Sequence, residues 1–308
     1  MTITPVTLTG KRILITGATG FVAKPIVTAL SKECTIFAGA RFKKETDKKA
    51  MKALGAIPVT LDLAGKNFSE LPDVDYVINL AVAKSGKWDT DLAINAEGVG
   101  KLLTRYKDIE AFLHFSSTGV YEYCGHEMMT EESALGDNHR NLFETYSISK
   151  IASETVARFV ARQHGIPTTI ARLNVPYGDF PCWPFFHLMM MQNDMPIDIH
   201  PDGPNGYSPI HSDDYVKKIP YLLAAASNDV NTINLAGDET VSIEQWCEYL
   251  GMLTGLTPTF NKTDKALGNL TVSNEKLKKL SGACEKDWKQ SIEDMVAVMA
   301  PDLLKAAV

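Results

Sequence analysis

Short apolar runs alternate with helix-length amphipathic segments along most of the chain. The runs that we expect to form buried strands cover residues 13–15, 35–40, 57–61, 76–80, 111–116, 168–173 and 232–235. Strands that alternate with helices in this way predict one parallel sheet with helices on both faces. Ligands of such sheets bind at the carboxyl ends of the strands, so candidate site residues are sought there.

The pattern changes after Gly178, where the sequence becomes rich in aromatic residues, Met, Pro and Gly through His211. We expect this segment to open a smaller mixed α/β lobe. Ser242 and Gln245 have the spacing of a capping box at the start of a helix in the C-terminal part of that lobe. The predicted limits are 1–174 and 212–236 for the main domain, and 175–211 and 237–308 for the lobe.

A glycine-containing turn follows the first predicted strand, in the order Thr16, Gly17, Ala18, Thr19 and Gly20, and a helix over roughly 21–30 comes next. Glycines let a backbone approach a pyrophosphate, and the helix N-terminus offers free N–H groups and the positive end of a dipole. The turn therefore predicts a dinucleotide site in a Rossmann-type, doubly wound parallel sheet. An ordinary strand–turn–helix corner is the alternative for this motif alone.

Tyr146 and Lys150 are four residues apart in YSISK, a spacing that places both side chains on one face of a helix. A free tyrosine has a pKa of about 10, and a nearby ammonium favours the phenolate form. The pair could therefore carry a proton during hydride transfer, although a Tyr and a Lys at this spacing usually form a solvated helix face.

The segments TGATGFVA, SSTGVY and YSISK occur in the order and approximate spacing of extended short-chain dehydrogenase/reductases, the NAD(P)-dependent epimerase/dehydratase family, which this chain resembles over most of its length. The resemblance implies Ser117, Tyr146 and Lys150 as catalytic residues. It also implies cofactor contacts from a larger set: Gly17, Thr19, Gly20, Phe21, Val22, Arg41, Asp62, Leu63, Leu80, Ala81, Tyr146, Lys150 and Val175.

Arg41 decides the expected cofactor, because it occupies the position that carries an acid in NAD-binding relatives. An arginine can pair with a 2′-phosphate through two hydrogen bonds, whereas an acid would repel that phosphate. NADP(H) is therefore expected, with NAD(H) as the alternative.

Three departures from the family pattern bear on the substrate and the reaction. Val175 stands where nucleotide-sugar members place an asparagine, and Tyr207 stands where they place an arginine that grips the diphosphate. Thr118 and Gly119 replace the Asp–Glu pair of the sugar 4,6-dehydratases. These departures disfavour a nucleotide sugar and that route of dehydration.

The lobe instead offers aromatic residues and methionines, which could line an apolar pocket or simply pack the lobe. They are Phe180, Trp183, Phe185, Phe186 and Met189 to Met191. Substrate contacts are expected from Thr118, Trp183, Phe186 and Tyr207. Lys84 could face the substrate, but a surface lysine is the plainer interpretation.

We therefore expect an oxidoreductase that interconverts a secondary alcohol and a ketone on an apolar or aromatic small molecule. An epimerase of a sugar-like substrate is the first alternative, and a non-catalytic NADP sensor is the second. The resemblance also implies a homodimer.

Charge and cysteine content narrow the class of protein further. A formal net charge of −6 without a basic stripe argues against a nucleic-acid partner. The five cysteines have no metal-type spacing, so we expect free thiols, no metal and a cytoplasmic protein. Neither a membrane-spanning segment nor a signal peptide is expected.

Overall fold

The computed structural model describes residues 3–305 and contains a seven-stranded sheet as its largest element. All of its neighbouring strands pair in parallel, in the order β11-β6-β5-β4-β1-β2-β3. The strands are β1 (Arg12–Thr16), β2 (Thr35–Ala40), β3 (Ile57–Thr60), β4 (Tyr76–Asn79), β5 (Ala111–Ser117), β6 (Thr168–Leu173) and β11 (Asn231–Leu235). The predicted α/β class is confirmed, and each predicted strand is present with ends that differ by at most one residue.

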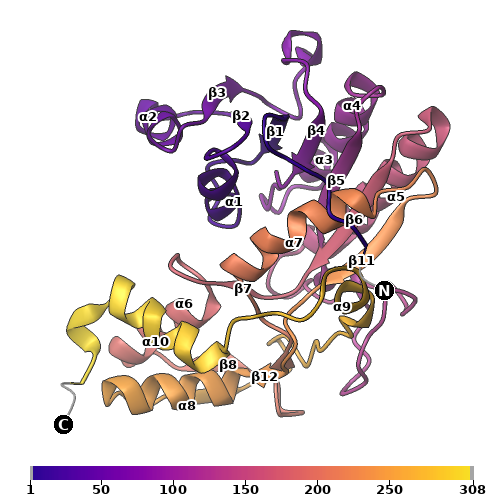
Figure 1. Ribbon diagram of the computed structural model, residues 1–308. Helices are drawn as coiled ribbons and strands as arrows, with labels where there is room; N and C mark the ends of the chain where they lie inside the picture. Colours follow the sequence, from indigo (N-terminus) through magenta and orange to yellow (C-terminus); the bar gives the residue numbers. More distant parts are fainter. Residues whose placement is uncertain (1–2, 306–308) are drawn as a thin grey trace.

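Helices cover both faces of this sheet, as a doubly wound fold requires (Figure 1). One face packs against α1 (Ala23–Leu30), α2 (Glu45–Ala53), α7 (Ser212–Ala224) and α9 (Glu275–Ser281). The other face packs against α4 (Gly98–Arg105) and α5 (Tyr146–His164). Between β4 and α4 the chain forms α3 (Trp88–Leu92) and a π-helical turn, Ala93–Glu97.

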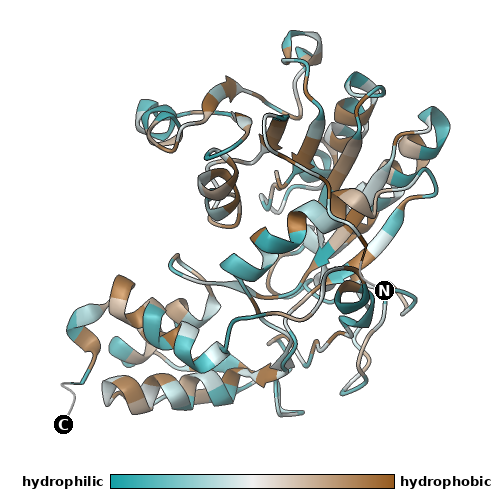
Figure 2. Cartoon of the chain, in the orientation of Figure 1, coloured by the Kyte–Doolittle hydropathy of each residue, from teal (hydrophilic) through white to brown (hydrophobic). Residues whose placement is uncertain are grey.

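The strands lie at the middle of the core between the helices of the two faces, and Figure 2 shows those at the centre of the sheet in brown. Ile13, Ile15 and Ile78 are fully buried on the face that α1 covers, whereas Leu14 and Val77 are fully buried on the α4 and α5 face. Successive side chains of a strand point to opposite faces, so a strand covered on both sides must be apolar throughout. This explains why the strands are mainly apolar in the sequence instead of alternating with polar residues.

Strand order reverses between β1 and β4, so their carboxyl ends diverge and leave a crevice between the loops that follow them. The loop after β1 is the glycine turn, and the loop after β4 contains residues 80–87. The fold therefore brings the glycine turn, the loop after β4 and the end of β5 together at one edge of the sheet.

A second core lies beneath that edge, where α6 (Trp183–Gln192), α8 (Ile243–Thr254) and α10 (Trp288–Met299) pack together (Figure 1). Short strand pairs complete this lobe: β7 (Pro176–Tyr177) with β10 (Ile210–His211), β8 (Ile197–Ile199) with β13 (Phe260–Lys262), and β9 (Gly206–Tyr207) with β12 (Val241–Ser242). The predicted capping box of α8 is confirmed, because the side chains of Ser242 and Gln245 each accept a hydrogen bond from the other's backbone N–H.

The segment after 236 contributes to both cores, since Leu277 of α9 packs with the main-domain residues while Met295 of α10 packs within the lobe. The exact domain limits remain a prediction. Within residues 3–305, no helix is long and apolar enough to cross a membrane.

Candidate active site

Two adjoining cavities open at the edge of the sheet where β1, β4 and β5 end. The larger has a volume of about 390 Å³ and the smaller about 220 Å³, and both are bounded by Gly17, Gly20 and Leu80. The larger volume falls in the usual range of small-molecule sites, roughly 300–1,000 Å³. Each candidate site residue from the sequence lines at least one of the two cavities.

The glycine turn fits a dinucleotide phosphate group. Gly17 has a φ of +65°, and a Cβ there would lie 2.8 Å from the Cα of Ala81, so only glycine is accommodated. The N–H groups of Phe21 and Val22 donate no hydrogen bond to any group of residues 3–305, and the first turn of α1 contains no acidic residue. These groups could bind an anion. Helix α1 begins at Ala23, two residues later than predicted, because residues 21–22 still belong to the turn.

Residues that the sequence assigns to the adenosine end line the smaller cavity. They are Thr19, Arg41, Asp62, Leu63 and Ala81, and they come from the ends of β1, β2, β3 and β4. The carboxylate of Asp62 accepts a hydrogen bond from the N–H of Ala64 at 3.1 Å, which fixes its orientation after β3.

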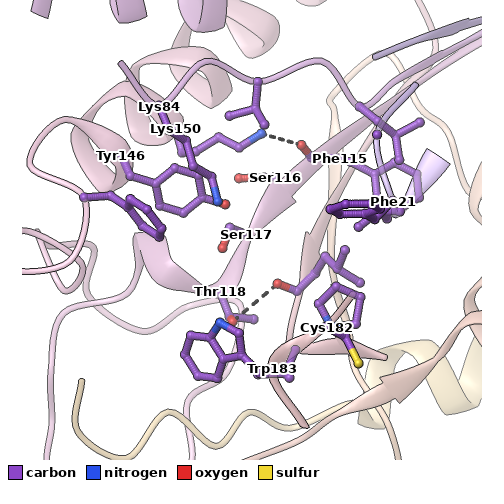
Figure 3. A pocket seen from close by; sticks show the side chains of 18 of the residues that line it. Phe21, Lys84, Phe115, Ser116, Ser117, Thr118, Tyr146, Lys150, Cys182 and Trp183 are labelled. Atoms are coloured by element: carbon purple, nitrogen blue, oxygen red, sulfur yellow. Dashed lines mark hydrogen bonds between the residues drawn. The ribbon is translucent and has the colours of Figure 1, made fainter. Parts of the chain in front are cut away.

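Ser117, Tyr146 and Lys150 lie together on the wall of the larger cavity (Figure 3). Ser117 ends β5, and its hydroxyl accepts a hydrogen bond from the N–H of Gly119 at 3.0 Å. Tyr146 and Lys150 are on the first turn and a half of α5, on the same face as predicted. The ammonium of Lys150 donates to the carbonyl oxygen of Phe115 at 2.7 Å.

Burial sets the protonation of this group. Desolvation raises the pKa of Tyr146, and the Ser117 hydroxyl partly opposes that rise. Desolvation, together with the charge of Lys84, lowers the pKa of Lys150 to about 8. With protein groups alone, Tyr146 is therefore a neutral phenol, and a further positive charge beside it is needed to favour the phenolate that could take a proton.

A chain of buried hydrogen bonds leads from β4 to the backbone carbonyl of Lys150. Asn79 on β4 donates to Nδ1 of His114 at 2.9 Å, and Nε2 of His114 lies 2.9 Å from the hydroxyl of Ser153. Ser153 in turn donates to the carbonyl oxygen of Lys150 at 2.8 Å. Burial and the charge of Lys150 lower the pKa of His114 to about 3, so it stays neutral and positions the helix.

Ser116 has a structural contact instead of a catalytic one. Its hydroxyl donates to Glu154 at 2.6 Å, and Glu154 forms a buried ion pair with Arg172 at 2.8 Å. The two adjacent serines therefore differ in their contacts, since the hydroxyl of Ser116 is bound to Glu154 while that of Ser117 accepts from the N–H of Gly119 on the cavity side of β5. The side-chain amide of Asn174 also donates within the protein, to the hydroxyl of Thr118 and the carbonyl oxygen of Leu270.

The expected substrate residues Thr118, Trp183, Phe186 and Tyr207 all line the larger cavity, as does Val175. Tyr207 is fully buried, and its hydroxyl donates to the carbonyl oxygen of Gly268 at 3.1 Å. Both interpretations of the aromatic and methionine residues apply: Phe180 and Trp183 line the cavity and also pack the lobe core, and Phe186 lines the cavity. The lobe core also contains Phe185, Met189, Met190 and Met191.

The sequence did not single out two further cavity residues, His139 and Phe143, in the irregular segment before α5. The ring of His139 lies 5.5 Å from that of Tyr146, and burial lowers its pKa to about 4. Lys84 is exposed, as a surface lysine would be, and it also lines the cavity, so both interpretations of this residue hold. Within residues 3–305, no cluster of three or more His, Cys, Asp or Glu side chains could hold a metal ion.

Comparison with known proteins identifies the class. The model of the NAD dependent epimerase/dehydratase family matches residues 13–236, so the chain belongs to this family. It is an enzyme of the extended short-chain dehydrogenase/reductase type. The predicted resemblance is thereby confirmed.

One curated relative is a trifunctional UDP-glucose 4,6-dehydratase, UDP-4-keto-6-deoxy-D-glucose 3,5-epimerase and UDP-4-keto-L-rhamnose reductase from Arabidopsis thaliana, 26% identical over 92% of this chain. The chain spans about half the length of that relative, 46%.

Solved structures share the fold. A UDP-glucuronic acid 4-epimerase from Bacillus cereus, in complex with UDP-glucuronic acid and NAD, matches with a TM-score of 0.79 at 21% identity, over 93% of this chain and 98% of that one. A UDP-N-acetylglucosamine 4-epimerase from Methanobrevibacter ruminantium M1 matches with a TM-score of 0.81 at 17% identity, over 96% and 100%.

These findings change two expectations. They support the sugar-epimerase alternative better than the reduction of an apolar or aromatic ketone. They also lend no support to a preference for NADP, since the family is described as NAD dependent and the Bacillus structure contains NAD.

Proposed function

We propose that this enzyme is an epimerase that oxidises one secondary alcohol carbon of a sugar-like substrate and reduces the resulting ketone on its other face. The carrying observation is the placement of Ser117, Tyr146 and Lys150 around one cavity, beside a glycine turn that fits a dinucleotide. The family match and the fold shared with sugar-nucleotide epimerases support the epimerase over a net dehydrogenase.

Each catalytic side chain has a distinct part in this proposal. Tyr146 takes the hydroxyl proton during oxidation and returns a proton during reduction. Ser117 donates a hydrogen bond to the reacting oxygen as charge develops on it. The ammonium of Lys150 would favour the phenolate of Tyr146 and would hold the nicotinamide ribose of a bound cofactor. The bound cofactor supplies the hydride acceptor and donor.

For the cofactor we propose NAD(H), which the Bacillus cereus epimerase structure contains. Arg41 lines the smaller cavity and is exposed, so it is available for the adenosine end in either case. Calorimetric titration should show NADH binding at least as tightly as NADPH. A clear preference for NADPH would instead restore a role for Arg41 as a phosphate ligand.

A net alcohol–ketone oxidoreductase is the second candidate, and the apolar cavity wall favours it. Phe180, Trp183 and Phe186 offer little to the hydroxyl groups of a sugar. The same Ser117, Tyr146 and Lys150 group would serve that reaction, so the two candidates differ only in whether reduced cofactor leaves.

Measurement of cofactor turnover separates the two candidates. Purified protein with NAD is incubated with UDP-glucuronic acid, UDP-glucose or simple secondary alcohols. An epimerase yields a second sugar stereoisomer, detected by NMR, with no net NADH. Accumulation of NADH in proportion to product would support the oxidoreductase, and a lack of any conversion across the panel would contradict both.

We also propose a homodimer formed through α4 and α5. On α5, Phe159 is 68% exposed, which is unusual for a large aromatic side chain. Gel filtration should give twice the mass of one chain, and Phe159→Ser should shift the protein toward a monomer. A single-chain mass for the wild type would remove this proposal.

A further inference from the structure

The larger cavity is lined by positive charge and by no negative charge. Its ionisable lining residues are Lys84, Lys150, His139, Tyr146, Cys182 and Tyr207, with no Asp or Glu among the described residues that line it. Low pKa keeps His139 neutral at pH 7, so the two ammonium groups dominate the field inside. An apolar cavity with uncompensated cations favours an anionic ligand.

Lys84 lies beside the reacting group. Its ammonium is 4.6 Å from the ring centre of Tyr146 and 4.5 Å from that of Phe143, and Figure 3 shows the side chain alongside Tyr146. In residues 3–305 no carboxylate pairs with this ammonium, and it donates no hydrogen bond. Lys150, by contrast, donates to the carbonyl oxygen of Phe115.

The backbone around Lys84 is fixed from both sides. Asn95 accepts from the N–H of Ala83 at 2.7 Å and donates to its carbonyl oxygen at 2.9 Å. Asp91 accepts from the N–H of Ser85 at 2.9 Å and from its hydroxyl at 2.7 Å. Both supporting side chains are almost fully buried.

The same two supports are tied to the catalytic helix. Asn95 donates to the hydroxyl of Ser149, and Asp91 accepts from the hydroxyl of Thr145, the residue before Tyr146. The loop that contains Lys84 is thereby held in register with Tyr146. The backbone on either side of Lys84 is therefore fixed, while its exposed side chain reaches the cavity, an arrangement expected of a binding group on a positioned loop.

The charge of Lys84 also affects the other ammonium group of the cavity. Desolvation lowers the pKa of Lys84, and the charge of Lys84 contributes to the low pKa of Lys150. An anion beside Lys84 would stabilise both ammonium groups. Charge-assisted hydrogen bonds from an ammonium are about 2.7–2.9 Å long, and the Lys84 ammonium lies 4.6 Å from the ring centre of Tyr146, so an anion that it binds would lie close to the reacting group.

We propose that Lys84 binds a carboxylate carried by the substrate next to its reacting carbon, so the preferred substrate is an acidic sugar of the uronate type. This rests on the proposed epimerase function. Tyr207 supports the same view, because it places an uncharged ring where a diphosphate-binding cation was expected. The anion-binding group is therefore at the reacting end of the cavity.

The test measures binding to the full-length protein loaded with NADH, so that no turnover is required. Two matched pairs serve as probes: UDP-glucuronic acid with UDP-glucose, and D-glucuronate with D-glucose. Each pair differs only in a carboxylate against a hydroxymethyl group. Wild type, Lys84→Met, Lys84→Arg and the exposed control Lys87→Met are compared by calorimetry at low ionic strength.

We expect wild type and Lys87→Met to bind the acid of at least one pair about tenfold more tightly than its neutral partner, as a charge-assisted hydrogen bond provides. Lys84→Met should reduce this preference to about twofold or less with little change in NADH affinity, and Lys84→Arg should retain most of it. The proposal is overturned if wild type shows no acid preference, including failure to bind any probe. It is also overturned if the preference survives in Lys84→Met, or if that variant loses NADH affinity instead.

Sugar turnover, measured separately by NMR, distinguishes this proposal from the epimerase itself. An acid preference that depends on Lys84, with no epimer formed from any probe, would sustain the carboxylate site and remove the epimerase. Epimerisation of neutral sugars without an acid preference would support the epimerase and remove the carboxylate site.

Discussion

Substitution of Arg172 by methionine should destabilise the protein far more than substitution of Arg158, although both arginines contact the same carboxylate. Glu154 on α5 pairs with Arg172 on β6 at 2.8 Å and with Arg158 at 3.1 Å. The side chain of Arg172 is 3% exposed, whereas that of Arg158 is 28% exposed, and Glu154 itself is 2% exposed.

Burial determines the expected magnitudes. Removal of Arg172 leaves a carboxylate without its main partner in a site that water hardly reaches, and breaking a buried pair in this way costs about 3–5 kcal/mol. The ion pair with the partly exposed Arg158 should contribute less than about 1 kcal/mol to the free energy of unfolding. Arg172 also donates to the carbonyl oxygen of Glu131 and lies over the ring of Tyr121, so its loss falls toward the upper part of the range.

Urea denaturation, followed by fluorescence and by circular dichroism, measures these differences. The double variant Arg172→Met with Glu154→Leu should recover at least half of the loss, because it removes the orphaned charge. Equal losses for Arg172→Met and Arg158→Met, or no recovery in the double variant, would refute the view that the buried pair holds α5 against the sheet.

Three further predictions concern local structure and acid stability. Gly17→Ala should abolish cofactor binding, because the new Cβ would lie 2.8 Å from the backbone of the loop after β4. Gly10→Ala, with a similar φ and open space, should lower the free energy of unfolding by only about 1–2 kcal/mol and leave cofactor binding intact, so equal cofactor affinities of the two variants in calorimetry would contradict the close-approach argument. Ser242→Ala should destabilise the protein by about 1 kcal/mol through loss of the α8 cap, measured by urea denaturation, and an unchanged midpoint would count against it. Burial alone would raise the pKa values of Asp91 and Glu154, but their hydrogen bonds outweigh burial and lower both pKa values. The two carboxylates therefore stabilise the fold above their unfolded pKa values, and this stabilisation is lost as pH falls through their folded pKa values; a free energy of unfolding that does not fall on acidification below pH 4 would contradict this.

The sequence predicts the sheet well because its strands are covered on both faces. The run 35–40 is mainly apolar and coincides with β2, and the run 168–173, which coincides with β6, contains two threonines and Arg172 among its apolar residues. The glycine turn and the Tyr146–Lys150 pair are also local patterns, since a turn and a helical spacing of four are set by neighbouring residues. Their convergence on one cavity follows from the parallel topology.

What the sequence could not predict depends on contacts between distant segments. Lys84 resembles a surface lysine until Asn95 and Asp91 fix its loop beside α5. His139 lies in an irregular segment without periodicity, and only the tertiary fold places its ring against Tyr146. The substrate could not be predicted from the aromatic and methionine residues of the lobe, because some of them line the cavity and others pack only the lobe core.

Replacement of Tyr146 by phenylalanine tests the central claim most directly. Wild type and Tyr146→Phe are each mixed with NAD and with the best substrate from the sugar panel, and hydride transfer is followed by transient absorbance of the nicotinamide. Because positioned acid–base groups contribute about 10²–10⁴-fold, we predict a rate at least a hundredfold lower for the variant, with NAD affinity changed less than about threefold. An unchanged rate of hydride transfer would contradict the account of this site.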